Sequence, residues 1–327
     1  MDFFFLLTFI EKCDKIISGD FMKKHLFLII YTILLISATV FSVLSTFVIS
    51  KEKTDVPILG DDFIPDIFET EDEEENYYFT DKKGNKCYKD SNIEIKITQI
   101  RKYSTEIYIA DIKISDYHLL KTAFANDTFG LNIKEKPSKI GERMNAILTI
   151  NGDYYGFREK GYVLRNGKLY EPDRKPRDSV SDILVVNNDG SFSIKKEAAQ
   201  TSTSLYEEGA WQVFCFGPGL IGDGNILVNE QSEVAAYKAS NPRTAIGYIE
   251  EGHYVMVVSD GRTSESAGLS LYQLALVLDN YGVKDAYNLD GGGSSVMVFN
   301  GEIINKPTTN GDVIVERSCS DIVYIGY

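Results

Sequence analysis

The fold is decided by three segments that follow one another in the chain: HYVMVVSDGR (253–262), SLYQLALVLDNYG (270–282) and DAYNLDGGGSS (285–295). The first and third are apolar runs that each end in an aspartate followed by glycine, as strands leading into turns do. The middle segment has apolar residues at i, i+3, i+4 and i+7 counted from Leu271, which is a helical spacing. Ser270 before it begins a capping box. The sequence therefore predicts a strand, a helix and a second strand.

The two aspartates of this unit, Asp260 and Asp290, are predicted to emerge at one edge of the sheet. A strand, crossover helix and strand in one sheet are parallel in nearly all cases. On neighbouring or next-but-one strands the carboxylates would stand about 5 to 10 Å apart, within the range used to cleave glycosidic bonds. One Asp-Gly pair alone more often marks a turn. Two on one strand-helix-strand unit favour a site.

A glycine-rich loop follows the second aspartate. Without side chains, its backbone amides can approach a ligand closely and form an anion-binding nest. The residues of this predicted cradle are Gly291, Gly292, Gly293 and Ser294. Carboxylates beside an anion cradle favour a sugar that carries phosphate as the ligand.

Composition places the chain among ordinary globular proteins and excludes one class of partner. Of its 327 residues, 43% are hydrophobic and 25% are charged. The formal net charge is −14, and no basic stripe is present that would follow a phosphate backbone. Nucleic acid is therefore excluded as the expected partner.

The N-terminal part is organised differently from the rest. Residues 26–50 carry no charged side chain and follow Lys23 and Lys24, so they are long enough to cross a bilayer. The lysines favour a cytoplasmic N-terminus and an extracytoplasmic remainder. We interpret this segment as a transmembrane signal anchor of a single-pass membrane protein. A cleaved signal, which would give a secreted protein, is the alternative, and Met22 is an alternative start.

The sequence predicts four successive regions. Residues 1–25 form a cytoplasmic N-terminus and residues 26–50 the membrane span. Residues 51–78, with an acidic run between Glu69 and Glu75, form a solvated stalk because the segment repels itself and has little to bury. Residues 79–327 form the globular domain.

Cysteines and histidines give no metal site or disulfide framework. Cys13 falls on the cytoplasmic side, and one bridge among the other three stays open. The three histidines lie far apart in the chain without ligand spacing, so zinc is not expected. No cofactor is predicted, although a hard cation such as calcium held by aspartates stays open. The three outer cysteines are Cys87, Cys215 and Cys319.

The globular region is predicted to be α+β: sheet-rich mixed β with several hairpins, a few helices and one βαβ unit that carries the site. Alternating patterns predict paired strands, and Asn-Gly or Asp-Gly dipeptides predict hairpin turns. The expected strands lie at 93–100, 106–115, 146–150, 245–250 and 254–259, the hairpin turns at 166–167, 189–190 and 300–301, and short helices at 117–126 and 137–146.

Four segments together resemble the phosphodiester glycosidase family. They are INGDYYGF (150–157), NPRTAIGY (241–248), VVSDGR (257–262) with the helix after it, and NLDGGGSS (288–295). The resemblance runs from about Ser91 to the C-terminus. It implies hydrolysis of an α-linked sugar from a phosphodiester, or of a related glycosidic bond in an envelope glycan or exopolysaccharide. The substrate partner would be a carbohydrate or sugar phosphate.

The resemblance also gives roles to individual residues. Asp290 would act as nucleophile or general base, with Asp260 as its partner or as the acceptor of a sugar hydroxyl. Asn151 would hold a hydroxyl or phosphate oxygen, and Arg243 and Arg262 would contact phosphate through their planar forks.

Two aromatic residues and one further acid extend this hypothesis. Tyr154 and Tyr155 would stack on a sugar ring, although aromatic residues at strand ends more often belong to the core. Asp153 stands where the family's lysosomal member has glycine, and it is either a third catalytic carboxylate or a turn residue. A hydrolase is the favoured function, and a non-catalytic carbohydrate-binding or polysaccharide-assembly module on the same fold is the alternative.

Overall fold

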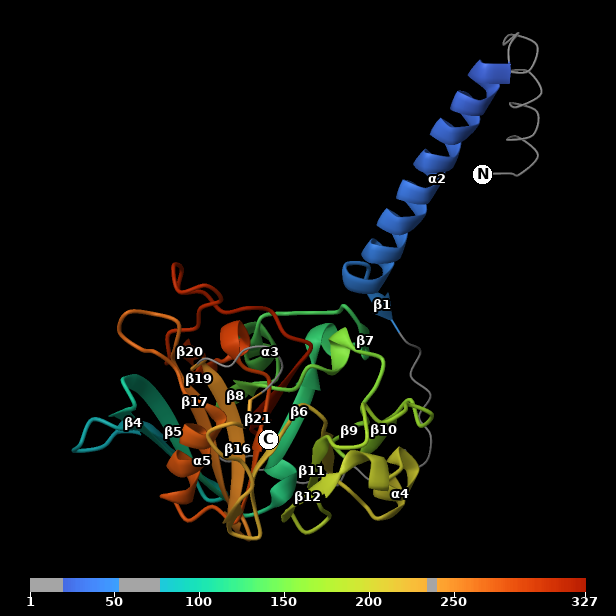
Figure 1. The fold of residues 1–327 in the computed structure, drawn as a ribbon. Helices are drawn as coiled ribbons and strands as arrows, with labels where there is room; N and C mark the ends of the chain where they lie inside the picture. The colour runs from blue at the N-terminus through green and yellow to red at the C-terminus, as the bar shows by residue number, and fades with distance from the viewer. Residues whose placement is uncertain (1–19, 53–76, 234–239) are drawn as a thin grey trace. The chain divides into compact units, whose positions relative to one another are not determined.

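The computed structural model describes residues 20–52, 77–233 and 240–327. The chain divides into two compact units, Met1–Ser50 and Lys51–Tyr327. In the first unit, helix α2 (Asp20–Phe47) contains the apolar stretch Leu26–Thr46, which is long and apolar enough to cross a membrane (Figure 1). A signal sequence has the same character. The predictions for Cys13 and for the acidic run of the stalk lie outside the described residues.

The second unit is built on a nine-stranded sheet with the order β15-β14-β18-β16-β17-β5-β4-β3-β2. Its neighbouring strands all pair in the antiparallel sense. Its strands are β2 (Tyr78–Thr80), β3 (Lys86–Lys89), β4 (Ile93–Lys102), β5 (Thr105–Ile114), β14 (Gly219–Gly222), β15 (Asn225–Ile226), β16 (Arg243–Glu250), β17 (His253–Ser259) and β18 (Asp285–Asn288).

Two five-stranded sheets and one small ladder complete the unit. One sheet has the order β20-β19-β8-β21-β6 and the other β10-β9-β13-β11-β12, while β1 pairs with β7. The strands are β1 (Lys51–Glu52), β6 (Leu120–Phe124), β7 (Gly130–Leu131), β8 (Leu148–Asn151), β9 (Val163–Arg165), β10 (Lys168–Tyr170), β11 (Asp182–Val186), β12 (Phe192–Lys196), β13 (Gln212–Phe214), β19 (Met297–Phe299), β20 (Glu302–Ile303) and β21 (Asp321–Ile325).

Helices are short in this unit. They are α3 (Pro137–Arg143), α4 (Ser202–Glu207) and α5 (Leu271–Asp279), with 3-10 turns η1 (Tyr117–Leu119), η2 (Ala125–Asp127), η3 (Tyr155–Phe157), η4 (Glu197–Ala199) and η5 (Gly292–Ser294). Ser270 caps α5 through the predicted capping box with Gln273. The sheet-rich α+β class is confirmed.

The central strands are apolar on both faces because each face packs on something different. Along β17, Met256 and Val258 join the core between the nine-stranded sheet and the two smaller sheets. Val255 and Val257 alternate with them and join a second cluster with Leu271 and Leu274 of α5. Helix α5 lies against this sheet (Figure 1). Period-2 side-chain alternation thus supplies two cores from one strand.

The predicted strand-helix-strand unit is confirmed as β17, α5 and β18. β16 lies between the two strands and pairs antiparallel with both, so β17 and β18 are parallel next-but-one neighbours. Asp260 directly follows β17, and Asp290 comes two residues after β18. Both therefore leave the sheet at the same edge.

The predicted hairpins are confirmed, and one predicted helix is wrong. β9–β10, β11–β12 and β19–β20 pair across the expected turns, and the expected strands 245–250 and 254–259 pair with each other as parts of β16 and β17. The segment 117–126, expected to be helical, forms a 3-10 turn, then strand β6, and then the start of a second 3-10 turn. The backbone groups of β6 pair with β21, about two hundred residues later in the chain. That pairing overrides a weak local helix pattern.

Candidate active site

The four sequence segments converge at one place, where the ends of β8, β16, β17 and β18 meet. The Asn151 side chain ties three of them together: its Nδ2 donates to the Asp290 carbonyl at 2.7 Å, and its Oδ1 accepts from Thr244 Oγ1 at 2.8 Å. The Asp290 amide donates to the Gly152 carbonyl at 3.3 Å. The Arg243 backbone N–H donates to Ser259 Oγ at 3.0 Å, and this bond connects the remaining segment, 257–262, to the other three. Asn151 is fully buried, so it can hold the Asp290 backbone in place but cannot itself meet solvent.

A pocket of about 300 Å³ opens at this place. It combines one carboxylate with two cations, two aromatic rings and two serine hydroxyls. The lining residues are Lys134, Tyr154, Phe157, Asp290, Ser294, Arg317 and Ser318. Aromatic faces with a few convergent polar groups are typical of small-molecule sites, and of sugar sites in particular.

Asp290 is the acidic residue of this pocket. Its Oδ1 accepts the Gly291 amide at 2.9 Å, and its Oδ2 lies 3.5 Å from Arg317 Nη2. Arg317 also donates to Ser294 Oγ, from Nε at 3.1 Å and from Nη2 at 2.6 Å. Burial raises the pKa of Asp290, and the hydrogen bond from Ser294 and the charge of Arg317 partly offset that rise. The result is a poorly hydrated carboxylate beside a half-exposed guanidinium.

The two predicted stacking tyrosines have different surroundings. Tyr154 is 39% exposed and lines the pocket. Its ring lies 4.9 Å from that of Phe157, at 31° to it. Tyr155 is buried and stacks on Phe129 in a separate core cluster. Only Tyr154 of this pair is therefore placed to meet a sugar.

Asp260 shares the sheet edge with Asp290 but does not line the pocket. It is 2% exposed. Its Oδ1 accepts the Lys306 amide at 2.7 Å and Asn305 Nδ2 at 3.3 Å. Burial raises its pKa, and these hydrogen bonds oppose the rise. Asp260 thus fixes the start of the segment that leads to Arg317, and its predicted catalytic role stays a prediction.

Asp153 lies in a buried ion network beneath the pocket. It accepts the amides of Tyr155 and Cys215, at 2.7 and 3.0 Å. Its Oδ2 lies 3.2 Å from Nη2 of Arg165, which also binds Asp321. Because Asp153 is 1% exposed and does not line the pocket, its placement favours a structural role over the proposed catalytic one.

Both predicted phosphate-binding arginines are engaged within the protein. Arg243 Nη2 contacts Glu233 Oε2 at 2.7 Å, and its Nε donates to the Leu269 carbonyl at 2.9 Å. Arg262 donates from Nε and Nη2 to Asn241 Oδ1, at 3.2 and 3.1 Å. The cations that line the pocket are Arg317 and Lys134, neither of which the sequence singled out.

The glycine loop serves close packing. The Gly292 amide donates to the Pro242 carbonyl at 2.8 Å, and the Gly291 amide already serves Asp290. Gly292 has a φ of +60°, and a Cβ there would lie 2.8 Å from Arg262 Nη2. Glycine is therefore required for backbone conformation and for contact with the 241–262 region. Among the residues of the predicted cradle, Ser294 is the one that lines the pocket.

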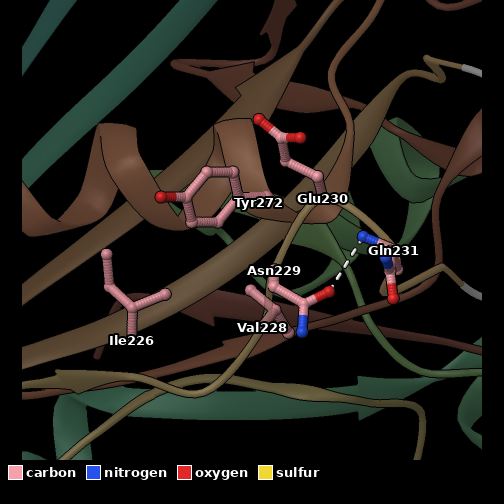
Figure 2. Close-up of a pocket in the computed structure, with 6 residues that line it drawn as sticks. All are labelled: Ile226, Val228, Asn229, Glu230, Gln231 and Tyr272. Atoms are coloured by element: carbon pink, nitrogen blue, oxygen red, sulfur yellow. Dashed lines mark hydrogen bonds between the residues drawn. The ribbon is translucent and has the colours of Figure 1, made fainter.

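A wider hollow of about 540 Å³ lies elsewhere, lined by Ile226, Val228, Asn229, Glu230, Gln231 and Tyr272 (Figure 2). The Gln231 amide donates to Asn229 Oδ1 at 2.8 Å. None of these lining residues is cationic, so among the residues that the structure describes the hollow offers no charge partner to a phosphate. The Asp290 pocket is therefore the better candidate site.

Comparison with known proteins identifies the family. The family model for phosphodiester glycosidases matches residues 144–326, which include every pocket residue except Lys134. The chain belongs to the phosphodiester glycosidase family. Cys87, Cys215 and Cys319 are buried and free, so the bridge left open by the sequence is not formed. Within the described residues no group of three or more His, Cys, Asp or Glu is arranged to hold a metal ion.

Two curated relatives and one solved structure resemble this phosphodiester glycosidase. SPbeta prophage-derived protein YomE of Bacillus subtilis is 26% identical over 76% of this chain and 39% of its own length. N-acetylglucosamine-1-phosphodiester alpha-N-acetylglucosaminidase of Mus musculus is 35% identical over 39% of this chain and 29% of its own length. The chain thus spans well under half of either relative.

The solved structure shares the fold. The zebrafish N-acetylglucosamine-1-phosphodiester alpha-N-acetylglucosaminidase catalytic domain, auto-inhibited by its pro-peptide, aligns with a TM-score of 0.57 at 20% identity. The alignment covers 72% of this chain and 83% of the zebrafish domain.

Proposed function

We propose that this protein hydrolyses sugar phosphodiesters, cleaving the bond between the anomeric carbon and the phosphate oxygen at Asp290. Two observations support the proposal. The chain belongs to the phosphodiester glycosidase family, and its pocket places one carboxylate beside Arg317 and Lys134. The name of the mouse relative makes an α-N-acetylglucosamine phosphodiester the first substrate to test.

The observation that carries the proposal is that, among the residues the structure describes, one carboxylate rather than two lines the pocket. Most glycosidases need a carboxylate that reacts and a carboxylic acid that protonates the leaving oxygen. Asp290 is the acidic residue among those that line the pocket. A phosphate leaves as a stable anion, so it needs charge stabilisation more than a proton. One carboxylate with two cations therefore fits a phosphodiester better than an ordinary alkyl glycoside.

In this mechanism Asp290 acts on the anomeric carbon, either directly as nucleophile or by activating a water molecule. Arg317 and Lys134 stabilise the charge on the departing phosphate. Tyr154 and Phe157 hold the sugar ring by its apolar face. Ser294 fixes Arg317 and Asp290 relative to each other.

The location and source of the substrate are also proposals. The apolar N-terminal helix, whether an anchor or a signal, would direct the enzyme domain out of the cytoplasm. Phosphodiester-linked sugars of the cell envelope or exopolysaccharide would then be its substrates. No cofactor is included in the proposal.

The proposal is tested with two matched substrates, methyl α-N-acetylglucosamine-1-phosphate diester and methyl α-N-acetylglucosaminide. We expect the full-length protein in detergent to release N-acetylglucosamine from the diester at least about 10²-fold faster, since general acid help contributes that much or more to an alkyl leaving group. Equal rates would show that a general acid is present. Binding of the diester without turnover would favour the carbohydrate-binding module instead.

Arg317 should also control the pH dependence of the reaction. Asp290 must be ionised to react, so activity rises as pH rises through its pKa, which burial places above the ordinary value. Arg317→Gln removes a charge that lowers this pKa and a partner of the phosphate. We expect the acid limb of the kcat/KM profile to move to higher pH and KM to increase.

The matched variant Arg317→Lys keeps the charge. It should retain most of the wild-type position of the acid limb while losing the two-nitrogen contact with Ser294. If the glutamine variant and the wild type had identical acid limbs, Arg317 would have no influence on the ionisation of the reacting carboxylate.

A further inference from the structure

A second cavity, of about 460 Å³, lies between the β2–β3 turn and the strands β4 and β5. It shares no lining residue with the Asp290 pocket. Its floor is apolar and its rim is charged. The residues that matter for its chemistry are Lys83, Lys86, Arg101, Glu106, Tyr108 and Ile304.

The charge of this cavity is opposite to that of the whole chain. Three cations and one carboxylate line it, whereas the chain carries a formal net charge of −14. Arg101 Nη1 contacts the one carboxylate, that of Glu106, at 2.6 Å. This pair leaves the two lysines as the net positive charge of the cavity.

Both lysines are available to a ligand. Lys86 Nζ contacts Glu302 Oε2 at 3.0 Å, but the two side chains are 47% and 71% exposed. An exposed ion pair contributes little, so an anionic ligand can replace Glu302 at small cost. In the part of the chain that the structure describes, the ammonium group of Lys83 contacts no carboxylate within 4.0 Å.

The floor of the cavity suits the apolar face of a sugar ring. The Tyr108 ring and the side chains of Ile97 and Ile304 line this floor, since Ile97 and Tyr108 belong to the same core cluster and Ile304 packs against it. Aromatic and aliphatic groups beneath a rim of charges and amides form the usual surroundings of a bound carbohydrate. A purely inorganic anion would leave this floor unused.

The cavity is joined to the active site by a short stretch of chain. Ile304 lines the cavity, and Arg317 lines the Asp290 pocket. Between them Asp260 accepts the Lys306 amide, and Tyr108 Oη lies 3.5 Å from Asp260 Oδ2. One stretch of chain thus carries a lining residue of the cavity at its beginning, Ile304, and a lining residue of the Asp290 pocket at its end, Arg317.

We propose that this cavity is an accessory subsite for an anionic segment of a glycan, one that bears carboxylate or phosphate groups. The inference rests on the proposed function in one respect, that the protein acts on a glycan. Lys83 and Lys86 would bind the anionic groups, and Tyr108 with its isoleucine neighbours would pack against a sugar ring.

The test is calorimetric binding by the full-length protein in detergent, without turnover. The probes are hexagalacturonate, a glycerol-phosphate hexamer and neutral maltohexaose. We expect one or both anionic probes to bind, with an affinity that falls as salt rises, and maltohexaose to bind far more weakly. The anionic probe that binds more tightly identifies the anion that the subsite prefers.

Paired variants locate the binding. Lys83→Gln with Lys86→Gln should raise the Kd of the anionic probe about tenfold, through the loss of two exposed charge contacts. Lys89→Gln is the matched control. Lys89 lies on strand β3, as Lys86 does, and has a similar exposed ion pair, to Glu94, but it does not line the cavity. Equal Kd values for both variants, or tight binding of maltohexaose, would overturn the inference.

The proposed reaction can be judged separately. The Lys83 and Lys86 substitutions should leave cleavage of the small methyl diester unchanged, since neither residue lines the Asp290 pocket. Asp290→Asn should keep its affinity for the anionic probe. If the anionic probes did not bind, the proposed hydrolysis would be unaffected. If the methyl diester were not cleaved, the binding of anionic glycans would be unaffected.

Discussion

Replacing Asp290 by asparagine is expected to lower kcat on the methyl diester by at least about 10³-fold, within the range seen when a reacting carboxylate or base is removed. Asparagine keeps the size of the side chain and an oxygen that can accept the Gly291 amide. It cannot attack carbon or take a proton from water. The measurement is the initial rate of N-acetylglucosamine release at saturating substrate.

The control for this variant is Asp260→Asn, at the same edge of the sheet. Asp260 is bound to Lys306 and Asn305 and does not line the pocket, so its substitution should affect thermal stability more than kcat. Melting curves of both variants will separate the two effects. If Asp290→Asn kept a kcat within tenfold of the wild type, Asp290 would be neither the nucleophile nor the general base.

The strand-helix-strand unit was within reach of the sequence. The signals are local: apolar periodicity, a capping box at Ser270 and Asp-Gly turns. Chain topology then places Asp260 and Asp290 at one edge. Asn151 could be assigned to the site, but its role in holding the Asp290 carbonyl could not be predicted. That hydrogen bond connects the ends of strands in two different sheets.

Which carboxylate faces the pocket could not be predicted, because it depends on partners far away in the chain. Asp260 turns to Asn305 and Lys306, and Asp153 turns to Arg165. Arg317 gave no signal, since it stands in a segment without periodicity or motif. Its position follows from contacts with Ser294 and Asp290 across the loop.

The largest expected effect on stability comes from Arg165, whose side chain lies beneath the pocket. Arg165 is 2% exposed. Its Nη2 lies 2.9 Å from Asp321 Oδ2 and 3.2 Å from Asp153 Oδ2, and its guanidinium lies over the Phe214 ring at 4.5 Å. One buried guanidinium thus forms ion pairs with two buried carboxylates. Arg158 Nη2 also contacts Asp153 Oδ2, at 3.4 Å.

The two carboxylates respond differently to this arrangement. Burial and the neighbouring Asp153 raise the pKa of Asp321 to about 7, against the effect of Arg165. Asp321 Oδ1 is buried without a hydrogen-bond partner, which makes it the natural place for the proton. Burial also raises the pKa of Asp153, but Arg165, Arg158 and two backbone amides more than offset it, so that pKa is lowered.

Arg165→Met is expected to lower the free energy of unfolding by about 3 to 5 kcal/mol at pH 7, because it leaves buried carboxylates without their charge partner. The measurement is denaturant unfolding of the full-length protein in detergent, followed by circular dichroism. Arg143→Met is the matched control. Its partners Asp127 and Glu135 are 63% and 21% exposed, so the loss should stay below about 1 kcal/mol.

The pH dependence distinguishes an ionic cause from simple loss of packing. Without Arg165 the folded-state pKa of both carboxyl groups must rise above the unfolded value. Their stabilising contribution is then fully present below the unfolded pKa and is lost as pH rises through the folded one. The deficit of Arg165→Met should therefore shrink towards pH 5 and grow towards pH 8. Adding Asp321→Asn should recover part of it at pH 8. A deficit that is the same at both pH values and unaffected by Asp321→Asn would instead assign the role of Arg165 to its packing against Phe214.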